Sequence, residues 1–196
     1  MFFHSALRTA VRSQHKWLMS PRYFASVGDK VPSISLYKGF PDIEMVNVAE
    51  RCEGKSVIIL GLPGAFTPTW SNKQIPDYLK NQDALREEGI DEVLVYCVND
   101  SAVMQAWAKN QKIGLSMLTF LGDPASELTR ALDLELTHPG PQSKGLFGRC
   151  KRFAIHAKDG VINAIQVSEG PDDPAGDNNP SATLVDGILT AIQNAK

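Results

Sequence analysis

The chain has 196 residues, of which 43% are hydrophobic and 21% charged, and this composition argues against a disordered or fibrous protein. No apolar run approaches the roughly 20 residues of a membrane-spanning helix, so the sequence predicts no membrane insertion. A net charge of −2 provides no overall attraction to nucleic acid, and three cysteines are too few to hold together a secreted disulfide scaffold.

The first 24 residues differ from the rest of the chain in charge. They hold four basic residues and no acidic one, together with apolar and hydroxylated side chains. A basic, acid-free and amphipathic N-terminus is typical of an organellar transit peptide. Arg22-Tyr23-Phe24, followed by Ala25-Ser26, resembles a matrix-peptidase site. The sequence therefore predicts a mitochondrial targeting leader over 1–24 that is removed in the matrix, with a plastid leader or a basic tail without function as alternatives.

The remainder, 25–196, is predicted to form one domain in which strands alternate with helices. Its runs of β-branched residues indicate strands that are buried on both faces. Its predicted helices have an apolar stripe, and a glycine marks the end of one helix while capping residues mark the start of others. The first predicted elements are a short edge strand over 31–37, a strand over 56–61, a helix over 71–88, a strand over 92–98, a helix that begins at 99–101, a strand over 115–121 and a helix over 123–132.

The C-terminal third begins with a predicted hairpin. Strands over 151–157 and 161–167 flank Asp159-Gly160, which supplies the positive φ of a tight turn. A loop over 170–180 and a final helix over 181–194 follow. This order predicts an α/β domain with a thioredoxin-like fold, in which helices flank a central mixed β-sheet.

The loop after the 56–61 strand carries the most specific motif of the chain. Its sequence, Gly61-Leu62-Pro63-Gly64-Ala65-Phe66-Thr67-Pro68, resembles the catalytic loop of peroxiredoxins, and in particular of their type II branch, which includes the atypical two-cysteine enzymes. Other segments are also similar to that family, namely Val98-Asn99-Asp100 with Trp107, Lys151-Arg152-Phe153 and Asp159-Gly160-Val161. The resemblance covers about 28–195 and implies a thioredoxin-like fold of the peroxiredoxin type.

Peroxide reduction requires a thiolate, and a free thiol with a pKa of roughly 8.5 is mostly protonated at neutral pH. A cation and a helix N-terminus stabilise the anion. The resemblance implies that Pro63 and Thr67 belong to the catalytic loop, that the Thr67 hydroxyl donates to the thiolate or peroxide, and that Arg152 supplies the cation. It also implies no bound cofactor, peroxides as substrates, and glutaredoxin, glutathione or thioredoxin as the reductant.

The expected nucleophile is missing, because Trp70 stands where the family pattern has its peroxidatic cysteine. An indole cannot form a thiolate or enter the thiol–sulfenate–disulfide cycle. It is also much larger than cysteine, so we expect it to fill the peroxide pocket or to press against a partner. The alternative is that residue 70 is not the natural one, in which case the family reaction would be retained.

Cys150 is a candidate substitute for the missing thiol. It lies beside Arg149 and Lys151 and two residues before Arg152. If the strand extends that far, Cys150 and Arg152 point the same way, and the three cations would lower its pKa. The plainer interpretation is an exposed thiol at the start of a strand.

The other cysteines offer less. Cys97 lies within a predicted buried strand, where a thiol is usually an inert small apolar group, although a vestigial resolving role is an alternative. Cys52 is predicted in a polar turn as a partly exposed thiol. The stretch before the last helix, 178–181, holds no cysteine, so neither resolving arrangement of the type II enzymes is intact.

The remaining polar residues predict no metal site. His138 and His156 are too few and too scattered, and the acidic residues between Asp172 and Asp177 have no EF-hand spacing, which favours a solvated loop.

Two classes of function follow from these observations. The first is a non-catalytic peroxiredoxin-fold protein with a binding, assembly or scaffold role in a mitochondrial protein assembly. The second is an active thiol peroxidase, and a redox sensor that becomes glutathionylated is a third interpretation. Type II relatives often pair through the surface around this loop, so the resemblance also implies a homodimer with Phe66 at the contact.

Overall fold

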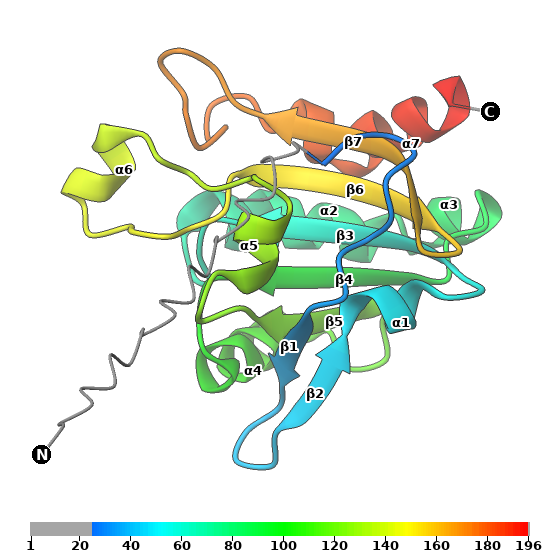
Figure 1. The fold of residues 1–196 in the computed structure, drawn as a ribbon, viewed down its shortest axis with the longest axis horizontal. Coiled ribbons are helices and arrows are strands. Elements are labelled where there is room, and N and C mark those ends of the chain that lie inside the picture. Colours follow the sequence, from blue (N-terminus) through cyan, green and yellow to red (C-terminus); the bar gives the residue numbers. More distant parts are fainter. Residues whose placement is uncertain (1–24, 196) are drawn as a thin grey trace, which may run out of the picture.

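A twisted mixed sheet of seven strands runs through residues 25–195, the part of the chain that the computed structural model describes (Figure 1). The predicted leader over 1–24 lies outside these residues. The spatial order of the strands is β2-β1-β5-β4-β3-β6-β7. Their bounds are β1 (Ser35–Lys38), β2 (Glu44–Asn47), β3 (Ser56–Leu62), β4 (Glu92–Cys97), β5 (Leu118–Gly122), β6 (Arg152–Lys158) and β7 (Val161–Ser168).

The centre of the sheet fixes where the site lies. Strands β3, β4 and β5 are parallel to one another, whereas β6 and β7 continue the sheet in antiparallel order. The three parallel strands carry nearly continuous apolar runs because both of their faces are covered. Since parallel strands end at the same edge of a sheet, the loops after β3 and β4 become neighbours there.

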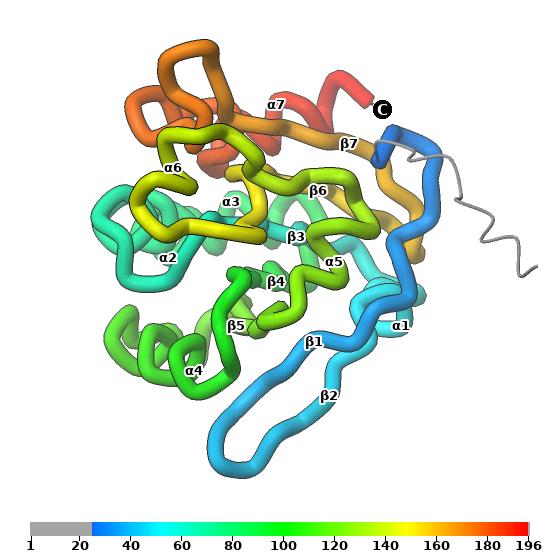
Figure 2. Tube along the Cα trace, turned by 60° about the vertical axis from the view of Figure 1, so that its left-hand side comes forward, coloured from blue at the N-terminus to red at the C-terminus, as the bar shows by residue number. Residues whose placement is uncertain are grey.

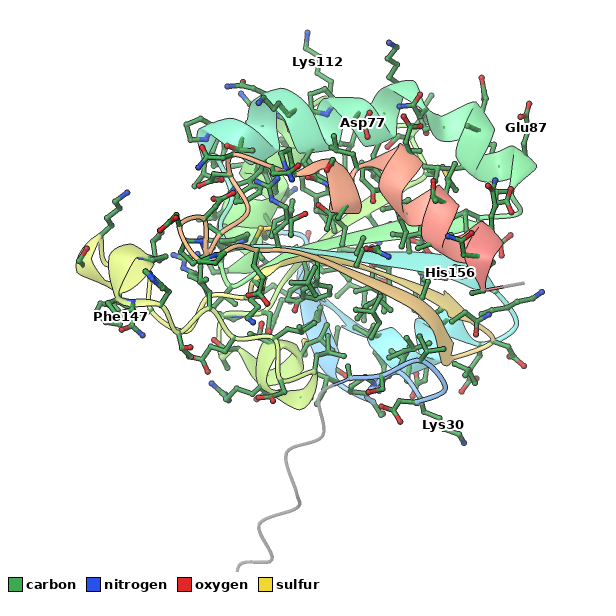
Figure 3. The ribbon with its side chains drawn as sticks, turned by 90° about the horizontal axis from the view of Figure 1, so that it is seen from above. Lys30, Asp77, Glu87, Lys112, Phe147 and His156 are labelled. Carbon is green, nitrogen blue, oxygen red and sulfur yellow. The ribbon has the colours of Figure 1, made fainter. Side chains whose placement is uncertain are left out.

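Helices cover both faces of the sheet (Figures 1 and 3). One core cluster packs beneath α2, α3, α4 and α7, and a second packs beneath α1 and α5. The helical segments are α1 (Val48–Cys52), the π-helical η1 (Trp70–Gln74), α2 (Ile75–Lys80), α3 (Gln82–Glu87), α4 (Ser101–Asn110), α5 (Glu127–Ala131), α6 (Pro139–Ser143), the 3-10 turn η2 (Ser181–Thr183) and α7 (Val185–Asn194).

The thioredoxin-like α/β fold is confirmed, but several elements differ from the prediction. The first strand begins at Ser35 rather than at 31, and the sequence missed β2, α1 and α6. The predicted helix over 71–88 is broken into η1, α2 and α3. Pro76 cannot donate a backbone hydrogen bond, and the wide π turn ends at Gln74, two residues before it. The break between α2 and α3 lies at Asn81, whose side chain donates to the Asp77 carbonyl.

Candidate active site

The loop after β3 is a tight turn at the carboxyl edge of the parallel strands. Pro63 and Gly64 are buried, and Phe66 is half exposed with a positive φ of 62°. The Thr67 hydroxyl donates to the Gly64 carbonyl at 3.1 Å, and the Thr67 carbonyl accepts from the Ser71 amide at 3.1 Å. Thr67 therefore closes the turn and begins the helical segment that carries Trp70.

An asparagine and an arginine tie this turn to the end of β4. Asn99 Oδ1 accepts from the Ala65 amide at 3.1 Å and from Arg149 Nη1 at 2.9 Å. Arg149 Nη1 also donates to the Val98 carbonyl at 2.7 Å. In the sequence, Asn99 belongs to a family-like segment and Arg149 is a neighbour of Cys150. The sequence did not show that the two support the loop, because they are 50 residues apart along the chain.

Trp70 is packed into the interior of its own chain, as one version of the sequence expectation had it. Its side chain is only 2% exposed and belongs to the core cluster beneath α2, together with Leu62 and Ile75. The guanidinium carbon of Arg152 lies 3.7 Å from the centre of the indole ring. That distance permits a cation–π contact, which strengthens when both groups are withdrawn from water.

Arg152 is fully buried, and most of its hydrogen-bonding capacity is unused. Its Nη2 pairs with Asp177 Oδ1 at 3.2 Å, whereas Nε and Nη1 have no hydrogen-bond partner among the residues that the structure describes. Burial lowers the pKa of Arg152 to about 10, although Asp177 and Asp173 act in the opposite direction. The guanidinium therefore stays charged at neutral pH, with the indole and one carboxylate beside it.

The acidic segment that sequence reasoning assigned to a solvated loop has a structural role. Asp173 accepts from the amides of Asp177 and Asn178 at 2.7 and 2.9 Å, which fixes the loop that presents Asp177 to Arg152. Asp177 remains 53% exposed, so the loop is solvated as predicted, but the sequence did not predict its ion pair with Arg152. The charge pattern alone did not show which buried cation faces these aspartates.

The cysteines do not provide a replacement nucleophile in this geometry. Cys150 is fully buried, and its thiol donates to the Leu62 carbonyl at 3.2 Å. Burial raises the pKa of Cys150, and Asp123 adds to the increase, so the expectations of an exposed or an acidified thiol were both wrong. Cys150 also packs in the second core cluster, whereas Arg152 contacts Trp70 of the first, so the two do not point the same way.

The remaining two cysteines are buried as well. Burial raises the pKa of Cys97 well above its ordinary value, in agreement with an inert strand thiol. Cys52 lies in α1 rather than in a polar turn, and the prediction of partial exposure was wrong. Burial raises the pKa of Cys52 to about 11. All three thiols are free in the structure.

The burial of the thiols makes a direct prediction. In the folded full chain at pH 8, a thiol reagent such as dithionitrobenzoate should modify none of the three cysteines in the mixing phase, since thiolate and access are both lacking. Guanidinium chloride should release all three as the control. Rapid modification of one native thiol would contradict the geometry, and peptide mapping would identify it.

Residues 25–195 contain neither a metal-binding cluster nor a membrane-spanning helix. No group of three or more histidine, cysteine, aspartate or glutamate residues there is arranged to hold a metal ion. None of the helices in this range is long and apolar enough to cross a membrane.

Comparison with known proteins identifies the family. A family model described as Redoxin matches residues 26–183. Peroxiredoxin-2C from Oryza sativa subsp. japonica is 37% identical over 147 residues, which cover 74% of this chain and 88% of the relative. The chain belongs to the redoxin family. Within it, the chain is a homologue of the peroxiredoxins.

Two further matches support the assignment of this chain to the redoxin family as a homologue of the peroxiredoxins. Peroxiredoxin-2E-2, chloroplastic, also from Oryza sativa subsp. japonica, is 36% identical over 148 residues, and the match covers 74% of this chain but 65% of that relative. The crystal structure of reduced Prx3 from Vibrio vulnificus in complex with H2O2 superposes with a TM-score of 0.71 at 30% identity, covering 86% of this chain and 96% of that chain. The peroxiredoxin type of thioredoxin-like fold is thereby confirmed.

Proposed function

We propose that this redoxin is a type II peroxiredoxin in which Trp70 occupies the place of the peroxidatic cysteine. It does not turn over peroxide and acts instead as a binding, assembly or scaffold protein. One observation carries the proposal: the buried indole lies against the guanidinium of Arg152, at the position where the family pattern has a thiolate beside its cation. An indole has no ionisable sulfur that could attack the O–O bond of a peroxide and become a sulfenic acid.

The roles of the surrounding residues follow from this proposal. Pro63 and Thr67 keep the shape of the loop, since the Thr67 hydroxyl is engaged with the Gly64 carbonyl inside the turn. Arg152 keeps a buried positive charge with two unused donor atoms. Donors of this kind would stabilise a thiolate or a peroxide oxygen in an active site. Here the guanidinium lies over the indole ring of Trp70 instead.

The second candidate function is an active thiol peroxidase that uses glutaredoxin, glutathione or thioredoxin. The Vibrio vulnificus relative, described as a complex with H2O2, supports peroxide chemistry for the family. In this chain the reaction would require a cysteine at residue 70, or Cys150 in its place. The buried Cys150 thiol, with its raised pKa and its bond to the Leu62 carbonyl, argues against the latter.

The proposed partners are a second copy of the chain and a protein assembly. Phe66, which the family resemblance implies at a dimer contact, lies in the loop and is half exposed, so it is available for such a contact. Buried Trp70 does not add to that surface. The contact therefore depends on Phe66 and its exposed neighbours rather than on the indole.

A peroxidase assay tests the inactivity. When the full chain is mixed with hydrogen peroxide and an excess of dithiothreitol or of thioredoxin with its reductase, peroxide should disappear no faster than with an equal concentration of free cysteine. The buried native thiols give the physical reason. A Cys150→Ser variant serves as the matched control for any residual rate. Rapid consumption that Cys150→Ser removes would overturn the proposal in favour of the second candidate.

The N-terminal segment 1–24, which precedes the domain over 25–196, is the basis of a proposal on where the protein is located in the cell. We place the protein in an organelle on the basis of the basic, acid-free leader. A chloroplastic relative supports the plastid, whereas the relatives described above give no support for the mitochondrial matrix, our first expectation.

An import assay tests this location. The full chain should yield a shortened, protease-protected product in isolated chloroplasts. Replacing Arg8, Arg12, Lys16 and Arg22 with glutamine should abolish that product, because the leader loses its charge. Isolated mitochondria are the parallel sample. Protection in mitochondria alone would restore the matrix assignment, and protection in neither organelle would contradict a targeting leader.

A further inference from the structure

The hairpin formed by β1 and β2 carries an unusual set of exposed apolar side chains. It lies at one end of the sheet and projects from the body of the molecule (Figure 2). Between 37% and 54% of the surface of each of these side chains is exposed. They are Tyr37, Phe40, Ile43 and Met45. Soluble monomers rarely gather large apolar groups on one projecting element, so this hairpin is a candidate interaction surface.

The strand register divides the hairpin into two different faces. Leu36 pairs with Val46, and both are buried in the second core cluster. Tyr37 pairs with Met45, so these two lie on the opposite, outer face, because successive side chains alternate across a strand. Ile43 is two residues from Met45 and shares its side.

The outer face is free of charge at its paired positions. The hairpin's ion pair, Lys38 Nζ to Glu44 Oε2 at 2.8 Å, occupies a cross-strand position on the same side as Leu36. The outer-face pairs are Ser35 with Asn47 and Tyr37 with Met45. Lysine and other charges at sheet edges normally discourage association, and this face has none at those positions.

The hydrogen bonds between β1 and β2 determine which backbone groups of β2 point toward its open edge. Within residues 25–195, β2 pairs only with β1. The Val48 amide donates to the Ile34 carbonyl at 2.9 Å, just beyond the strand. Since antiparallel ladders alternate, Val46 and Glu44 also bond toward β1. The amide and carbonyl of Met45 therefore point away from β1, toward the open edge.

We infer that this edge is an interface between two copies of the chain, in which β2 pairs antiparallel with β2 of a second copy and Met45 faces Met45 across the two-fold axis. Only a residue whose backbone groups point outward can sit on that axis and exchange two hydrogen bonds with its copy. An axis on Val46 would make that pair a non-hydrogen-bonded one and would set Glu44 opposite Val48, where the chain has already passed into α1. An axis on Glu44 would place its carboxylate against its own copy.

In the arrangement centred on Met45, the side chains that face each other across the two strands are also compatible. It sets Glu44 opposite Val46 of the second copy, and Ile43 opposite Asn47, so no like charges face each other. The outer faces of both hairpins then lie on one side of a continuous sheet. A shift by one residue would place the outer face of one hairpin beside the inner face of the other. The end of β2 at Asn47, the charge of Glu44 and the apolar pattern of the outer face therefore all favour the register centred on Met45.

This interface goes beyond the proposed function and does not depend on it. It uses neither Trp70 nor Phe66, and it lies on a different element from the loop implied at the family-type contact. An active or an inactive chain would form it equally. The two proposals therefore fail independently.

A cross-linking experiment tests the register. The three native thiols are buried, so a new cysteine on the hairpin should dominate oxidation of the full chain. Directly paired residues on antiparallel strands lie about 5.5 Å apart at Cα, within disulfide range. Met45→Cys should form a covalent dimer under mild oxidation at least about tenfold faster than Leu115→Cys, a matched variant at a fully exposed leucine elsewhere. Equal rates for the two variants would overturn the inference.

A charge-exchange experiment distinguishes a dimer formed through β2 from one formed through the loop that contains Phe66. In a Phe66→Glu background, which suppresses the loop contact, sedimentation should still give a dimer. Adding Met45→Glu or Met45→Lys should each give monomers, because like charges then oppose one another across the axis. Mixing the two variants should restore a dimer of one copy of each. A monomeric Phe66→Glu background at all concentrations, or a mixture that stays monomeric, would overturn the inference.

Discussion

Replacing Trp70 with alanine should lower the free energy of unfolding by about 3–5 kcal/mol, the range for large aromatic residues in a closed core. The indole is almost completely buried between the core residues beneath α2 and the guanidinium of Arg152. Its removal leaves a cavity and takes the aromatic face away from a buried charge that already lacks partners for two of its nitrogens. Urea unfolding followed by circular dichroism measures the change.

Two variants serve as controls for that loss. Trp70→Phe keeps a ring beneath Arg152 and should cost less than Trp70→Ala, because the cavity is smaller and the cation keeps an aromatic face. Leu115→Ala removes a fully exposed side chain and should change the free energy of unfolding by less than about 0.5 kcal/mol. A Trp70→Ala cost below about 1 kcal/mol would mean that the indole does not support this core.

Much of the central fold could be predicted from the sequence, because long elements carry a clear hydrophobic pattern. The runs over β3 and β4 are apolar at nearly every position, and only strands covered on both faces tolerate such runs. The β6–β7 hairpin was evident from Asp159-Gly160. In contrast, β2, α1 and α6 have four or five residues each, too few to establish a period.

Only those residues of the candidate site that belong to a family-like motif could be predicted from the sequence. The resemblance joined Thr67 and Arg152, which lie far apart along the chain, and the structure places Arg152 against Trp70. No local pattern could show that Asp177 pairs with Arg152, since the rest of β6, the whole of β7 and a loop separate them along the chain. The burial of Cys150 was missed for a related reason. Its sequence neighbours are cationic, but its surroundings in space are the second core cluster.

Replacing Trp70 with cysteine should create a thiol with a pKa between about 5 and 7, well below that of the native thiols. The sulfur would stand at the start of η1, where the first turn of a helical segment presents its amides. The guanidinium of Arg152, now without the indole, has two donor nitrogens free to meet a thiolate. Both effects favour the anion over the thiol.

Alkylation by iodoacetamide as a function of pH measures this pKa, and the unmodified chain provides the background from its buried thiols. In a Trp70→Cys, Arg152→Met double variant the pKa should return to about 8.5 or above, because the buried cation is gone while the loop is kept.

Stability provides an independent readout on the same variant. A folded-state pKa below the unfolded value of about 8.5 means that ionisation favours the folded state. The gain from the new thiolate is fully present above pH 8.5 and is lost as the pH falls through the folded-state pKa. The unfolding free energy of Trp70→Cys relative to Trp70→Ser should therefore rise between about pH 6 and pH 9. If the cysteine instead titrates at or above 8.5 and this difference stays flat, Asp177 holds Arg152 away from residue 70.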